Sequence, residues 1–263
     1  MRHWFFPLLF IIISCNNPLQ KNGSSDRKAF SAPTTMTGAK NYGGKEICWI
    51  GSFNGKTPVF IHYQLDSNLI IGEIIYLKTK NKLPITLLGT VKDDKSYRLL
   101  EFDNTGNITG VIEGKPTEKS FDGLWFSPKT KKELLMKLYS KDTSINSPNT
   151  NPDRSRIFGN YHYQYGNKGY NGDFNINKLV GNKIDFNILS LTNVERGPNI
   201  AEVEKDTIPM TGNNFIYKIP ESDSCEFKVT FYKGFVYINY INGYCQNQFG
   251  LSATIDGIYL KTK

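Results

Sequence analysis

Residues 57–77 read TPVFIHYQLDSNLIIGEIIYL, and this stretch decides the fold class. From Thr57 to Leu65 apolar side chains recur at every second position, and Leu69 to Leu77 continues in β-branched and aromatic residues. A period of two is typical of a half-buried β-strand. The stretch therefore predicts two consecutive strands separated by a short polar turn.

The rest of the chain repeats this pattern on both sides of the stretch. Asp103–Asn107 reads DNTGN, and Lys233-Gly234 also separates two apolar runs, as turn residues do. Only Thr130–Tyr139 allows a short helix as an alternative. Many short strands with Gly/Asn turns predict an all-β protein of antiparallel barrels or sandwiches. The further expected strands are residues 83–91, 97–102, 108–113, 121–126, 133–139, 160–165, 174–179, 183–189, 201–203, 215–219, 225–232, 235–241 and 252–260.

Two polar stretches divide the chain. Residues 15–43 lack periodic apolar positions, so we expect a flexible tether there. Residues 141–156 are rich in Ser, Thr, Asn and Pro, and such a long connection is uncommon inside a compact domain. We therefore predict two small antiparallel β-barrel or sandwich domains, residues 44–140 and 157–263, joined by this polar linker.

The first 14 residues have the features of a lipoprotein signal peptide. Arg2 supplies the positive start, and an apolar run too short to span a bilayer follows from Trp4 to Ile13. The sequence Ile12-Ile13-Ser14-Cys15 resembles the lipobox of bacterial lipoproteins, in which the cysteine carries acyl chains such as palmitate. The resemblance implies lipidation of Cys15 and a protein held in the cell envelope. We expect the outer membrane, on either its periplasmic face or its surface face. The alternative is an ordinary signal peptide followed by an incidental cysteine.

The charge balance bears on the partners. The chain has a net charge of +8, and loss of Arg2 with the signal leaves 31 Lys and Arg against 24 Asp and Glu, a charge of +7. These charges are scattered, with small groups such as Lys129, Lys131 and Lys132 that we interpret as solvated turns. Because the protein is expected to be exported and tethered to a membrane, we do not expect nucleic acid as its partner. A mildly basic surface favours an anionic envelope glycan or an acidic envelope protein.

Four cysteines have three expected fates. Besides Cys15, Cys225 and Cys245 flank the hairpin that turns at Lys233-Gly234, and export favours a disulfide between them. Two buried free thiols are the alternative. Cys48 lies beside Trp49 and is expected to be a buried apolar side chain. We expect no metal site, because the cysteines have too few other ligands near them.

No catalytic motif or cofactor-binding motif is found. The two histidines of the mature chain, His62 and His162, lie in strand alternation and are expected on the strand surface. Asp103–Asn107 has oxygen ligands at calcium-loop-like spacing, but a hairpin turn is the preferred interpretation. Three strand carboxylates could pair across a barrel interior as an acid and a base, as in glycosidases. They are Glu73, Glu101 and Glu113.

Tyrosines gather at two predicted hairpins. Exposed tyrosines would form a platform for a sugar or a protein, whereas buried ones would be ordinary cross-strand pairs. Alternation along a strand sends some of them outward. The candidate binding surface therefore comprises Tyr161, Tyr163, Tyr232, Tyr237 and Tyr240, with Tyr165, Tyr170 and Tyr244 beside them.

Two resemblances add to this interpretation. The pattern Cys225-x-Phe227-x-Val229-x-Phe231, with Cys245, Phe249-Gly250 and Asp256-Gly257-x-Tyr259, resembles the C-terminal hairpin of lysozyme-inhibitor-like small β-barrel lipoproteins. The first half is similar to a β-domain of Bacteroidetes envelope lipoproteins of unknown function. This similarity is seen in Gly72-x-x-x-Tyr76, Leu88-Gly89, Leu100-Glu101-Phe102-Asp103, Gly106-x-x-Thr109-Gly110, Gly114 and Gly123-x-Trp125. The resemblances carry no catalytic residue onto this chain.

The sequence therefore predicts a lipid-anchored envelope binding or interaction protein without catalytic activity, for which the resemblance implies lysozyme inhibition. One alternative is a glycan-acting hydrolase that uses the strand carboxylates. The other is a lipocalin-like carrier with an apolar ligand inside one barrel. Converging carboxylates would favour the hydrolase, a large apolar cavity the carrier, and filled barrels the interaction protein.

Overall fold

The computed structural model describes residues 46–143, 150–192, 197–222, 224–241, 245 and 248–262. The predicted signal peptide, Cys15, the tether up to residue 43, residues 144–149 of the predicted linker and Tyr244 lie outside the described residues. Tyr42–Lys263 forms one compact unit. In the described ranges no helix is long and apolar enough to cross a bilayer.

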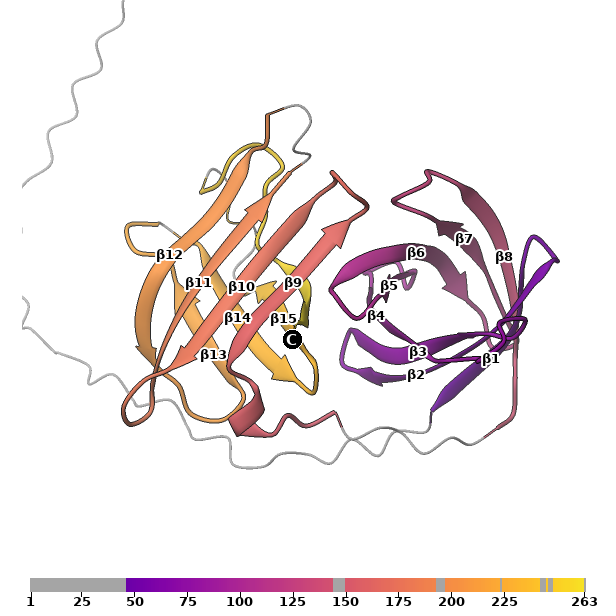
Figure 1. The fold of residues 1–263 in the computed structure, drawn as a ribbon, viewed down its shortest axis with the longest axis horizontal. Coiled ribbons are helices and arrows are strands. Elements are labelled where there is room, and N and C mark those ends of the chain that lie inside the picture. Colours follow the sequence, from indigo (N-terminus) through magenta and orange to yellow (C-terminus); the bar gives the residue numbers. More distant parts are fainter. Residues whose placement is uncertain are drawn as a thin grey trace, which may run out of the picture. The chain divides into compact units, whose positions relative to one another are not determined.

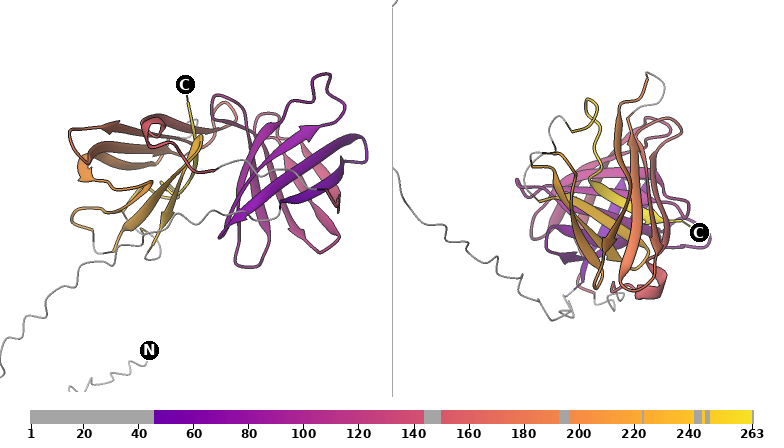
Figure 2. Two further views of the ribbon diagram at one scale, coloured as in Figure 1. Left: turned by 90° about the horizontal axis from the view of Figure 1, so that it is seen from below. Right: turned by 90° about the vertical axis from the view of Figure 1, so that its left-hand side faces the viewer.

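The first eight strands close into an antiparallel barrel. Each strand pairs with the next one along the chain, and β8 returns to pair with β1, so that Gly51 lies opposite Leu138. Figure 1 shows this ring, and the side view in Figure 2 shows the strands tilted, as barrel closure requires. The strands are β1 (Ile47–Phe53), β2 (Thr57–Asp66), β3 (Leu69–Tyr76), β4 (Ile85–Val91), β5 (Tyr97–Phe102), β6 (Asn107–Pro116), β7 (Ser120–Phe126) and β8 (Glu133–Ser140).

Aromatic side chains fill the interior of this barrel. Ring contacts run from Trp49 on β1 to Phe121 on β7 at 6.2 Å and on to Tyr97 on β5 at 6.0 Å. Tyr97 contacts Tyr63 on β2 at 5.9 Å, and the Trp49 Nε1 donates a hydrogen bond to the Tyr63 hydroxyl at 3.2 Å. Because these strands lie on different sides of the barrel, the rings span its interior. The space that an apolar ligand would need is occupied by side chains.

The other eight strands form a sheet that closes only in part. Its order is β12-β11-β10-β9-β16-β15-β14-β13, all antiparallel, which is an up-and-down barrel without pairing between β12 and β13. A short 3₁₀ helix, Arg154–Arg156, precedes it. The strands are β9 (Gly159–Tyr165), β10 (Asn171–Lys178), β11 (Lys183–Leu191), β12 (Ile200–Pro209), β13 (Asn214–Lys218), β14 (Glu226–Tyr232), β15 (Phe235–Tyr240) and β16 (Gly257–Lys261).

The all-β class is confirmed by this architecture. The two predicted ranges, 44–140 and 157–263, each contain eight strands, whereas their folding as independent domains stays a prediction. Thr130–Tyr139, for which a short helix was the alternative, forms β8. One strand, β1, was not predicted. It follows a polar segment, and its seven residues include Gly51 and the small polar Ser52, which interrupt the apolar pattern.

A short parallel pairing joins the two sets of strands. Asn107 and Ile108 of β6 pair with Gln164 and Tyr165 of β9. Gly106, with φ of 90°, permits this approach, because a Cβ there would lie 2.7 Å from the carbonyl oxygen of His162. One hydrophobic cluster continues across this pairing. From the barrel it includes the outer residues Leu69, Ile71, Leu88, Leu100, Phe102, Ile108 and Val111.

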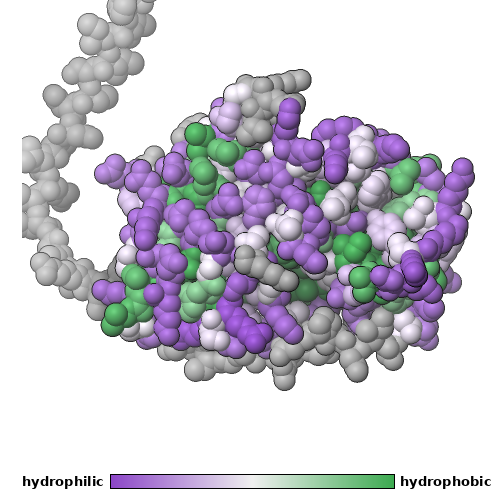
Figure 3. Space-filling model, in the orientation of Figure 1, coloured by the Kyte–Doolittle hydropathy of each residue, from purple (hydrophilic) through white to green (hydrophobic). Residues whose placement is uncertain are grey.

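Burial on both faces explains the sequence of the barrel's middle strands. Leu69-Ile70-Ile71 is a continuous apolar run, in which Ile70 belongs to the barrel interior and its neighbours to the outer cluster. Strands covered on both faces have such runs. The face seen in Figure 3 is mainly hydrophilic, with hydrophobic residues in small separate groups.

Candidate functional site

A cleft lies where the outer wall of the barrel meets β9, β15 and β16. It has a volume of about 610 Å³. This lies within the range of about 300–1,000 Å³ that is usual for small-molecule sites. From the barrel come Thr90 on β4, Arg98 and Leu100 on β5, and the β7–β8 loop; from the other strands come Tyr165, Tyr237 and the Thr254–Ile258 segment.

Tyrosines line one side of this cleft. Tyr163 lies in the core, Tyr165 and Tyr237 are half-buried, and Tyr170 is 44% exposed. Burial raises the pKa of Tyr237, the Asp256 carboxylate raises it further, and a hydrogen bond with Asn68 opposes the shift. The Tyr237 hydroxyl is therefore protonated at neutral pH and can donate a hydrogen bond.

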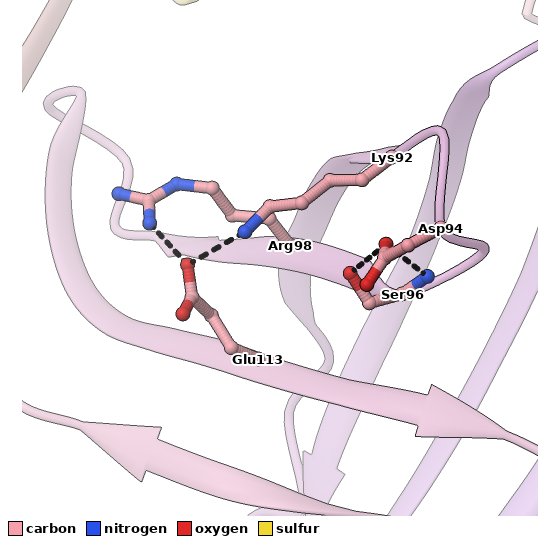
Figure 4. Close-up of polar contacts among 5 residues, drawn as sticks. All are labelled: Lys92, Asp94, Ser96, Arg98 and Glu113. Carbon is pink, nitrogen blue, oxygen red and sulfur yellow. Dashed lines mark hydrogen bonds and ion pairs between the residues drawn. The ribbon is translucent and has the colours of Figure 1, made fainter.

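Three cationic side chains line the same cleft. Arg98 and Lys92 both reach the Glu113 carboxylate, the lysine Nζ at 3.5 Å (Figure 4). In the β4–β5 turn next to them, Asp94 accepts hydrogen bonds from Ser96, which shapes the turn that carries Lys92. Lys131 is exposed in the β7–β8 loop, with its Nζ 5.8 Å from the centre of the Phe126 ring.

The charges of the cleft are only partly balanced. Partial burial disfavours the charged form of the Arg98 guanidinium, but the interactions with Tyr165 and Glu113 outweigh this effect and raise the pKa of Arg98. Burial likewise opposes ionisation of Glu113, yet Arg98 and Lys92 lower its pKa. Three cations, Lys92, Arg98 and Lys131, face two carboxylates, Glu113 and Asp256. The net positive charge favours an anionic ligand.

Two of the predicted binding tyrosines are core residues. Tyr161 is 1% exposed and Tyr163 is 7% exposed, so the prediction that they form an exposed platform is wrong. The Tyr161 hydroxyl donates to the Ile157 carbonyl at 2.6 Å, and that of Tyr163 lies 2.7 Å from the Ser190 hydroxyl. Both side chains face the aromatic interior of the second set of strands. Alternation along β9 is equally compatible with an inward and an outward position.

The other predicted tyrosines lie in different places. Tyr237 lines the cleft. Tyr232 stacks on Phe235 and donates to the Asp66 carboxylate at 2.9 Å. The Tyr240 hydroxyl lies 2.8 Å from that of Thr254 and accepts a hydrogen bond from the Ile255 amide. Of the five predicted residues, Tyr237 and the buried Tyr163 belong to the cleft.

The three strand carboxylates do not converge. Glu73 and Glu113 neighbour the interior residues Ile74 and Ile112, so both face outward. Glu101 faces inward, where it is 4% exposed. It accepts hydrogen bonds from the Tyr76 hydroxyl at 2.9 Å, the Trp125 Nε1 at 3.2 Å and the Thr109 hydroxyl at 2.9 Å. The barrel wall separates Glu101 from the other two, so the pair that glycosidase chemistry needs is not formed.

One predicted surface histidine is buried. His62 is 6% exposed, because Glu46, Glu73 and Phe60 surround its ring on the outer face of β2. Its Nδ1 lies 2.6 Å from Glu46 Oε1, and its Nε2 lies 3.3 Å from Glu73 Oε2. The expected surface position is therefore wrong for His62. His162 is partly exposed, and its Nδ1 lies 2.8 Å from the Asp173 carboxylate.

Cys225, Cys245 and Cys48 have the states that the sequence predicts. Cys225 and Cys245 form a disulfide, and Cys48 is a buried free thiol. Burial and the negative charge of Glu46 raise the pKa of Cys48, although Lys141 opposes this. A thiol of this kind is unreactive. The Asp103 carboxylate accepts hydrogen bonds from Thr105 and Asn107, which confirms the hairpin turn.

Arg98, Lys92 and Asp256 were not predicted as site residues. They come from β5, the β4–β5 turn and the segment before β16, which are distant in the sequence and meet where the two sets of strands join, at the β6–β9 pairing. Nothing in the local sequence indicates that pairing. No family model, curated protein or solved structure matches the chain.

Proposed function

We propose that this protein is a lipid-anchored cell-envelope binding protein that takes its ligand in the cleft between the barrel wall and β9, β15 and β16. The observation that carries the proposal is the cleft itself. It brings tyrosine rings and hydroxyls together with Arg98, Lys92 and Lys131 in a volume of about 610 Å³. Apolar rings combined with a few convergent polar groups are the usual composition of a ligand site.

The packing favours this function over the two alternatives. A carrier with its ligand inside the barrel would need the space that Trp49, Tyr63, Tyr97 and Phe121 occupy. A hydrolase with paired strand carboxylates would need Glu101 to face a second acid, and its carboxylate instead accepts three hydrogen bonds from neighbouring side chains. The cleft requires neither arrangement. Lysozyme inhibition stays a prediction of the resemblance.

Filling the cleft tests the proposal. Thr90→Trp places an indole in the cleft from the outer face of β4, and we expect it to abolish capture of envelope polysaccharide or protein by the detergent-purified full chain. Thr86→Trp is the matched control, because Thr86 lies on the same face of the same strand but outside the cleft lining. Capture by Thr90→Trp at the level of the wild type and of Thr86→Trp would show that the cleft is not the binding surface.

The lipid anchor has its own test. Cys15→Ser removes the acylated sulfur, and we expect the protein to move from the membrane fraction to the soluble fraction. Each buried CH₂ of an acyl chain contributes about 0.8 kcal/mol, so the loss of several chains should release the protein almost completely. Fractionation after a high-salt wash measures this, and a variant that stays with the membrane would contradict lipidation at Cys15.

A further inference from the structure

We propose that the ligand of the cleft is a carboxylated carbohydrate, such as a uronic-acid-containing glycan, which its tyrosine rings stack against and its cations neutralise. This inference rests on the proposed function and names the class of ligand. It depends on three features of the cleft: its rings, its charge and the hydrogen-bonding state of its strands.

The rings and hydroxyls suit sugars. Aromatic faces pack against the apolar C–H faces of pyranose rings, and the accessible Tyr170 and the half-buried Tyr165 offer such surfaces. Sugar hydroxyls need both donors and acceptors around them. The cleft supplies both through the hydroxyls of Tyr237 and Thr90, the amide of Asn68 and the carboxylate of Asp256.

The charge selects an acidic sugar over a neutral one. The Arg98 guanidinium has five N–H donors, so its contacts with Glu113 and Tyr165 leave donors for a carboxylate of the ligand. Lys131 is exposed, and within the described residues no carboxylate forms an ion pair with its Nζ. A ligand carboxylate near these two side chains would meet a net positive charge.

The strands argue against an extended peptide as the ligand. Peptides are commonly bound by adding a strand to a free sheet edge. The strands that line this cleft offer little of one: β4 pairs with β3 and β5, and β15 pairs with β14 and β16. β9 and β16 pair with each other through two residues each, which leaves only the short stretch Gly257–Tyr259 of β16 without a partner on that side. Recognition in the cleft therefore depends on side chains, as it does for sugars.

Calorimetric titration of the detergent-purified full chain tests the ligand class. The probes are an α-1,4-linked tetramer of galacturonic acid, its neutral methyl ester, and tetraglutamate as an acidic peptide. We expect the acid to bind at least tenfold more tightly than the ester and the peptide. Lys131→Gln and Arg98→Gln should each weaken binding of the acid by about tenfold and leave binding of the ester nearly unchanged.

Ring and charge contributions separate in a second pair of variants. Tyr170→Ala should weaken the acid and the ester alike, because stacking does not depend on the charge, whereas Lys218→Gln on β13 lies outside the cleft and should change neither. Equal binding of acid and ester would overturn the selection of an anion, and equal binding of tetraglutamate would overturn the carbohydrate. If no probe binds while Thr90→Trp still abolishes envelope capture, the result would contradict the carboxylated carbohydrate as the ligand and would leave the proposed function supported.

Discussion

Glu101→Leu is expected to lower the free energy of unfolding by about 2 kcal/mol. The carboxylate is 4% exposed and accepts hydrogen bonds from Tyr76, Thr109 and Trp125. The leucine side chain fills a similar volume but accepts nothing, so Tyr76 and Trp125 would lose their acceptor, whereas the Thr109 hydroxyl keeps the backbone carbonyl of residue 101 at 3.2 Å. Each donor left without a partner costs about 1–3 kcal/mol when it is buried. Removal of a buried charge offsets part of this cost, and Tyr76 and Trp125 are only half-buried, so the lower part of the range applies.

Urea unfolding of the full chain measures this loss. Glu101→Gln keeps one carbonyl oxygen as an acceptor and should cost less than leucine does. Glu133→Leu is the control, because Glu133 is exposed on β8 and its replacement should change stability by less than about 0.5 kcal/mol. An unchanged unfolding midpoint for Glu101→Leu would mean that water, and not the Glu101 carboxylate, satisfies the donors of Tyr76 and Trp125.

Much of the fold follows from local sequence. The alternation of Thr57–Leu65 and the turn at Lys233-Gly234 each correspond to an element of the structure, because strand period and turn chemistry act between near neighbours. The same alternation does not say which face is the interior. His62 and Tyr161 were therefore assigned to the surface, although other elements cover both side chains.

The cleft could not be predicted in the same way. Its rings and cations meet because Asn107 and Ile108 pair with Gln164 and Tyr165, and pairing between such distant segments leaves no periodic signal. Tyr165 and Tyr170 were noted as part of a tyrosine cluster, which was the available sign of the site. Arg98 sits in an ordinary alternating strand, where an outward-facing cation is typical of a solvated surface.

Replacing both Cys225 and Cys245 with alanine is expected to destabilise the protein by about 3 kcal/mol. The disulfide closes a loop with a sequence separation of 20, and the chain-entropy model gives about that value for such a loop. Reductant should destabilise the wild type by a similar amount and leave the double variant unchanged. Cys48→Ala, which removes the free thiol, is the control for cysteine replacement and should keep its response to reductant.

The disulfide is also expected to affect the cleft, because it constrains the segment between β14 and β16. Within that segment lie Tyr237, which lines the cleft, and Tyr240, which fixes Thr254 and Ile255 through its hydroxyl. Loosening the segment should increase the ordering entropy that is lost on binding, so the double variant should bind the cleft's ligand more weakly than the wild type. Unchanged binding together with reduced stability would show that the β15–β16 pairing alone fixes this wall of the cleft. A free thiol at Cys225 in protein isolated without reductant would contradict the disulfide itself.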